Sequence, residues 1–201
     1  MSPDPEAAKQ FLSQARMLRQ QGQTRKAIQV YQKVCEADPS MVEALNEMGL
    51  AYSHIGEQEE AIKVFDRAIG LRPNDPYAYS NKAEAYLAIG DFSQALSSAD
   101  AGLKVAPQNG RLWVMRARAL ESMGRVDEAV EAYREALKYE SEDPEIWKAL
   151  ALCLDALERW EEVARAYTIA ASLHRKRGQN QEAESCMKFA KRALDSSSAM
   201  A

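Results

Sequence analysis

Residues 45–73, LNEMGLAYSHIGEQEEAIKVFDRAIGLRP, contain the pattern that decides the fold. Gly56 divides this stretch in two, and a glycine accepts the left-handed backbone that ends one helix and reverses the chain. Ala61 follows five residues later and lets a second helix approach closely. Phe65 lies on the same face of that second helix and fills the space beside the alanine. The stretch therefore predicts two antiparallel helices joined by a short turn.

The same pattern returns every 34 residues along most of the chain. The turn glycine and the alanine behind it each occur four times in this phase, as Gly22, Gly56, Gly90 and Gly124 and as Ala27, Ala61, Ala95 and Ala129. A fixed period of this length is typical of repeat proteins, in which each unit stacks on the next. The sequence thus predicts paired helices in units at 8–41, 42–75, 76–109, 110–143 and 144–177.

The repeat resembles the tetratricopeptide repeat, in which large and small first-helix residues meet a Gly-x4-Ala-x3-aromatic-x2-Ala run. The second unit is nearly complete, with Leu45, Gly49, Tyr52, Gly56, Ala61, Phe65, Ala68 and Pro73. The resemblance implies an all-α fold, a right-handed α-solenoid of about five helix pairs plus a C-terminal capping helix. The fifth unit departs from the pattern, because Glu158 stands at the position of the turn glycine. The geometry of that turn is left open.

The carboxy-terminal residues predict one more helix. A second Gly-x4-Ala run, from Gly178 to Ala183, indicates a helix over about 181–194 that pairs with a helix from Trp160 to Lys176. It would cap the stack, since terminal repeats need a polar outer face. We expect a single solenoid over 1–195 and a disordered tail over 196–201.

Charge and hydropathy exclude several classes of function. The 201 residues carry a formal net charge of -4, which provides no overall attraction to nucleic acid or to an anionic membrane. The amino terminus lacks the basic start and apolar stretch of a signal peptide, and no apolar run approaches membrane-spanning length. We interpret the chain as cytoplasmic, without membrane insertion.

Catalytic and metal-binding patterns are absent from the sequence. His54 and His174 lie in different repeats and have no acidic or cysteine partner at ligand spacing. The cysteines, Cys35, Cys153 and Cys186, form no CxxC motif and are interpreted as buried thiols. The turn glycines, Gly22, Gly56, Gly90 and Gly124, are spaced by whole repeats, so they cannot form a phosphate-binding loop. The sequence predicts no enzyme, no metal and no cofactor.

The resemblance also implies where a partner would bind, because first helices of tetratricopeptide units line a concave groove. The groove positions are Leu12, Arg16, Arg19, Asn46, Leu50, His54, Tyr77, Asn81, Glu84, Arg111, Val114, Met115, Arg118, Lys148 and Leu152. Arg111 and Arg118 are two turns apart on one helix face, with Val114 and Met115 between them. This basic and apolar strip predicts a protein partner that presents an acidic and apolar segment. Self-association is also open.

Other readings of the surface remain. One variant of the family clamps a chaperone's terminal carboxylate, but only Asn81 and Arg111 match its five positions, so we expect no clamp. A groove with ordinary solvated charges and no partner is a further reading. The alternative class is nucleic-acid or polyanion binding through a basic carboxy-terminal cluster, formed by His174, Arg175, Lys176, Arg177, Lys188, Lys191 and Arg192. Nucleic acid is disfavoured, because aromatic residues are scarce there and the chain is acidic.

Overall fold

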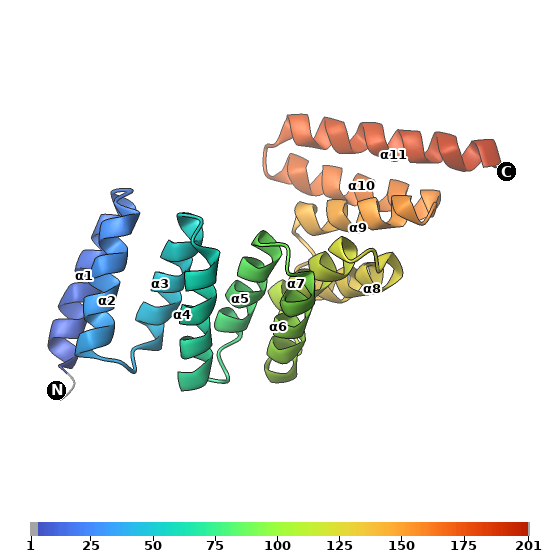
Figure 1. Cartoon of the computed structure of the whole chain (residues 1–201). Helices are drawn as coiled ribbons and strands as arrows, with labels where there is room; N and C mark the ends of the chain where they lie inside the picture. Colours follow the sequence, from blue (N-terminus) through green and yellow to red (C-terminus); the bar gives the residue numbers. More distant parts are fainter. Residues whose placement is uncertain (1–3, 201) are drawn as a thin grey trace. The chain divides into compact units, whose positions relative to one another are not determined.

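A computed structural model describes residues 4–200, which form eleven α-helices and no strand (Figure 1). The all-α fold predicted from the repeat is confirmed. Contacts between Cα atoms divide the chain into two compact units, 1–107 and 108–201, whereas the sequence predicts a single solenoid. Each unit is therefore described by itself.

The first unit consists of three consecutive helix pairs (Figure 1). Its helices are α1 (Pro5–Gln20), α2 (Thr24–Ala37), α3 (Val42–His54), α4 (Gln58–Leu71), α5 (Pro76–Ala88) and α6 (Phe92–Val105). Each helix packs against the next one along the chain. Tyr31, Leu45 and Phe65 are fully buried between them, which agrees with the apolar positions of the repeat.

The second unit contains two helix pairs and a final long helix. Its helices are α7 (Gly110–Ser122), α8 (Val126–Leu137), α9 (Pro144–Ala156), α10 (Trp160–Lys176) and α11 (Asn180–Met200). Helix α10 packs against both α9 and α11, as the second Gly-x4-Ala run predicts. Helix α11 buries a stripe of small side chains, Ala183, Cys186, Ala190 and Ala193.

The end of α11 differs from the disordered tail predicted over 196–201. The helix continues through Met200, and the Ser198 hydroxyl donates a hydrogen bond to the Leu194 carbonyl one turn earlier. The physical reason is that residues 195–200 contain neither glycine nor proline, so nothing in them breaks a helix that is already formed. The last residue of the predicted tail, Ala201, lies outside the described residues.

The helix ends follow the local rules that the sequence suggested. Asp4, Asp75 and Asp143 each precede a proline, and each carboxylate accepts a backbone N–H from the first turn of the following helix. In the fifth repeat (144–177), Glu158 adopts a φ of 56°. Gly124 takes the same left-handed conformation in the fourth repeat (110–143), with a φ of 73°. The turn is therefore kept without its glycine.

Candidate functional site

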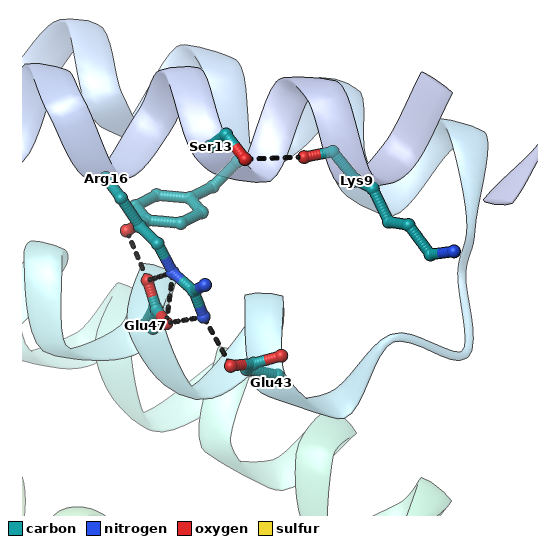
Figure 2. Close-up of polar contacts among 6 residues, drawn as sticks. Lys9, Ser13, Arg16, Glu43 and Glu47 are labelled. Carbon is teal, nitrogen blue, oxygen red and sulfur yellow. Dashed lines mark hydrogen bonds and ion pairs between the residues drawn. The ribbon is translucent and has the colours of Figure 1, made fainter. Parts of the chain in front are cut away.

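Arg16 on α1 lies in a network of acidic and phenolic groups that joins three helices of the first unit (Figure 2). Its Nη2 donates to Oε1 of Glu47 on α3 over 2.6 Å, and its Nε donates to the same oxygen over 2.9 Å. Nη2 also donates to Glu43 on α3. The hydroxyl of Tyr31 on α2 donates to the other Glu47 oxygen over 2.7 Å. The predicted groove arginine is thus neutralised within the chain.

The network fixes the charge state of its members. Burial alone would raise the pKa of the Glu47 carboxyl, but hydrogen bonds from Arg16 and Tyr31 outweigh burial and lower this pKa. The bond to Glu47 raises the pKa of Arg16. Burial and the same carboxylate raise the pKa of Tyr31. At neutral pH the site therefore holds a charged arginine, a charged Glu47 and a neutral tyrosine.

Two predicted groove residues of the first unit lie in the core instead. Leu12 and Asn81 are both buried, which corrects their assignment to a partner-binding surface. A third, Asn46, is half-buried and donates from Nδ2 to Oδ2 of Asp75 over 2.9 Å. Asp75 is itself the N-cap of α5, so Asn46 ties α3 to the start of the next first helix.

The remaining predicted residues of the first unit are exposed. Tyr77 at the start of α5 is 63% exposed, and Leu50 on α3 is 40% exposed. Arg19, His54 and Glu84 also reach solvent. The first helices of this unit thus present two large apolar side chains among polar ones.

In the second unit, a pocket of about 460 Å³ opens beside α7 and the first turns of α9. Its lining residues are Arg111, Val114, Arg118, Tyr133, Glu140, Asp143, Glu145, Ile146 and Ala149. Three predicted groove residues, Arg111, Val114 and Arg118, are therefore brought together at one cavity. Met115 is buried, which corrects its assignment to the groove. Its side chain takes part in the packing between helices.

The last two predicted residues lie outside the lining of this pocket. Lys148 pairs with Glu145, with its Nζ 2.8 Å from Oε2. Leu152 is 56% exposed and lines a smaller cavity of about 170 Å³. That cavity includes Tyr167 of α10 and Phe189 of α11, whose rings stack 5.2 Å apart. Leu152 on α9 therefore faces the cavity that it shares with α10 and α11.

Two members of the basic carboxy-terminal cluster, His174 and Arg177, are engaged within the chain. His174 is buried, and its Nδ1 lies 2.8 Å from the Gln179 side-chain oxygen. Arg177 donates to the Glu142 carbonyl over 2.6 Å. Helix α11 carries three basic and three acidic side chains, so its net charge is zero. The structure gives polyanion binding no specific support.

The cysteine side chains of the described residues are shielded from solvent. Cys35, Cys153 and Cys186 are free and buried, which confirms the interpretation from sequence. Burial raises the pKa of the Cys153 thiol to about 12, with Glu121 adding to the effect. Within residues 4–200, no group of three or more histidine, cysteine or carboxylate side chains is placed to hold a metal ion. No helix among them is long and apolar enough to cross a membrane.

Several residues of these sites were not identified from sequence. Glu43, Glu47 and Tyr31 complete the Arg16 network, and Tyr133 and Ala149 line the pocket. The repeat period does relate some of these residues, because Tyr31 and Tyr133 occupy the same position in their repeats. Glu43 and Glu145 are likewise equivalent, whereas the position of Glu47 is taken by Ala149.

Comparison with known proteins agrees with this architecture. The tetratricopeptide-repeat family model matches residues 12–76, 80–144 and 114–167. No curated protein matches the chain significantly. MamA 41-end from Desulfovibrio magneticus RS-1 has a TM-score of 0.75 at 22% identity, covering 85% of this chain and 96% of that one. TTC0263, a thermophilic TPR protein in Thermus thermophilus, has a TM-score of 0.71 at 22% identity, covering 90% and 98%. These likenesses show a shared fold, and the family match establishes that the chain belongs to the tetratricopeptide-repeat family.

Proposed function

We propose that this protein is a non-catalytic scaffold that binds a segment of another protein against the first helices of its repeats. The observation that carries the proposal is the pattern of exposure on these helices. Leu50 and Tyr77 in the first unit expose large apolar surface, and Val114 in the second unit lines an open pocket beside Arg118. Tyrosine and arginine are among the residue types that contribute most to binding energy at protein interfaces.

The chemistry of the buried groups supports a binding role over a catalytic one. An enzyme lowers the pKa of its nucleophile or brings the pKa of its acid and base near neutrality. Here burial raises the pKa of Cys35, Cys153 and Cys186, so their thiols are held protonated. Burial and a neighbouring glutamate likewise raise the pKa values of Tyr31 and Tyr133, further from neutrality.

The proposal is tested by capture from an extract of the source cells with matched surface variants. Leu50→Ser combined with Tyr77→Ser removes the apolar groups from the first helices of unit one. Leu71→Ser combined with Tyr139→Ser is the control, because Leu71 is 48% exposed and Tyr139 is 45% exposed, and neither lies on a first helix. Captured proteins are identified by mass spectrometry, and circular dichroism checks that both variants fold.

Loss of the same captured protein with the first variant alone supports the proposal. Equal capture by both variants contradicts it, and so does loss with the control variant alone. Sedimentation velocity of the purified protein distinguishes a different partner from a second copy of the chain. A concentration-dependent dimer that the first variant abolishes would identify the partner as the chain itself.

A further inference from the structure

The second unit contains a copy of the Arg16 site in which one carboxylate is replaced. Three repeat lengths relate Arg16 to Arg118, Tyr31 to Tyr133 and Glu43 to Glu145. At the remaining position of the set, Ala149 stands where the first unit has Glu47. The two sites therefore share an arginine, a tyrosine and one glutamate, but the second site lacks the glutamate that binds both the arginine and the tyrosine in the first.

The substitution coincides with a cavity. In the first unit, the Glu47 side chain fills the space beside α1 and α3, and its exposed fraction is 15%. In the second unit, Ala149 lines the pocket of about 460 Å³ together with Arg118 and Tyr133. Because helical repeats place equivalent residues in equivalent surroundings, this pocket corresponds to the place where Glu47 lies in the first unit.

Arg118 retains its hydrogen-bonding capacity, whereas its neighbours do not. No other described residue forms a hydrogen bond or ion pair with Arg118. The Glu145 carboxylate is turned to Lys148, 2.8 Å away, and lies 3.6 Å from Nε2 of His174. The Tyr133 hydroxyl donates to Glu121 over 2.7 Å. The guanidinium of Arg118 is thus a donor that the pocket offers.

The other two acidic side chains of the lining lie elsewhere along the pocket. Asp143 accepts the Glu145 backbone N–H and caps α9. Glu140 lies against the start of α7, where a Cβ on Gly110 would overlap its Cγ and lie 3.0 Å from its Oε1. Arg118 is eight residues further along α7, a rise of about 12 Å. The Glu140 side of the pocket, which Arg111 also lines, is therefore separated from the Arg118 guanidinium.

We propose that this pocket binds a single glutamate or aspartate side chain of a partner protein, with Arg118 as the donor and Val114 as the apolar contact. The inference rests on the scaffold function proposed above and names the side chain that the scaffold recognises. The bound carboxylate takes the role that Glu47 plays toward Arg16.

Propionate is the probe, because it is the glutamate side chain without its backbone. It is titrated into the full-length protein at constant ionic strength, and the Arg118 Nε–Hε signal is followed by NMR. Propionamide, which has the same shape without the charge, is the ligand control. The Arg16 Nε–Hε signal is an internal control, because Glu47 already holds that guanidinium. Arg118→Gln assigns the signal by removing it.

The expected result is a saturable shift of the Arg118 signal with propionate, none with propionamide, and none at Arg16. Ala149→Glu, which supplies the carboxylate from the chain itself, weakens propionate binding by roughly tenfold or more. Ala149→Glu also melts at a higher temperature than Ala149→Gln, and this difference disappears in the Arg118→Gln background.

Absence of a saturable shift at Arg118 overturns the inference, as does an equal response to propionamide or an unchanged response in Ala149→Glu. These outcomes are distinct from failure of the scaffold. If propionate does not bind but the first-helix variant still loses its captured protein, only the pocket assignment is wrong. If propionate binds and no protein is captured through the first helices, the scaffold proposal is wrong.

Discussion

The hydroxyl of Tyr31 on α2 donates a 2.7 Å hydrogen bond to Glu47 on α3, so the second helix of one repeat is tied to the first helix of the next. Glu47 also accepts from Arg16 on α1. One carboxylate therefore joins three helices and two repeats. Its removal leaves the fully buried Tyr31 with an unsatisfied hydroxyl.

Glu47→Ala should destabilise the protein by about 1–3 kcal/mol, the cost of leaving a buried polar group without its partner. Urea unfolding followed by circular dichroism measures this change. Glu36→Ala, an exposed glutamate on α2, is the control and should lie within about 0.5 kcal/mol of the wild type. Tyr31→Phe combined with Glu47→Ala should cost less than the two single changes added together. Additive costs would mean that the bond contributes nothing.

The same carboxylate makes stability depend on pH. Because the folded pKa of Glu47 is lowered, its contribution is complete above the ordinary glutamate pKa of about 4.3 and is lost as the pH falls through the folded pKa. The difference in unfolding free energy between wild type and Glu47→Gln should therefore be constant near neutrality and shrink in acid. Urea titrations at several acidic pH values test this. If the difference between wild type and Glu47→Gln grew as the pH fell, the pKa of Glu47 would not be lowered in the folded protein.

Gly49 is expected to tolerate no side chain, because Phe65 packs directly on it. A Cβ at this position would overlap Cε1 of Phe65 and lie 2.7 Å from Cζ of the same ring, which is fully buried. Gly49→Ala should lower stability by about 1–3 kcal/mol through overpacking. Gly70→Ala is the matched control, since no atom lies within 4 Å of its added Cβ. That change should raise stability by about 0.5–1 kcal/mol through helix propensity. Equal changes in stability for Gly49→Ala and Gly70→Ala would contradict the close packing of Phe65 on Gly49.

Glu158 holds a left-handed turn without the residue that favours it. Glu158→Gly should stabilise the second unit by about 1 kcal/mol, because glycine adopts a φ of 56° without steric cost. The melting temperature of the variant measures the effect. Gly124→Glu, the reverse exchange at the equivalent turn, should destabilise by a similar amount. A loss of stability in Glu158→Gly would show that the glutamate side chain has a role of its own.

Much of the fold could be predicted from the sequence because its causes are local. Turn glycines and Asp-Pro caps act within a few residues, and the repeat period follows from helix pairs of constant length. The end of α11 could not be predicted in this way. The Ser-rich segment after Leu194 reads as a tail, but its propensities do not oppose a helix that has already formed.

The candidate site could be predicted only in part, because pairing across repeats depends on residues far apart in the sequence. Position within the repeat predicted that Leu12 and Met115 line the groove, but both side chains are buried. Arg16 and Arg118 are equivalent in sequence. What distinguishes them is the residue on the following first helix, Glu47 in one case and Ala149 in the other.

Photo-crosslinking tests the central claim most directly, since it locates the partner on the surface without removing any contact. Benzoylphenylalanine replaces Tyr77 on a first helix or, as the control, Tyr139 outside the first helices, and both tyrosines are exposed. After irradiation in extract from the source cells, we expect one protein to be crosslinked at position 77 and not at position 139. Crosslinking of a protein at 139 with none at 77 would contradict binding by the first helices.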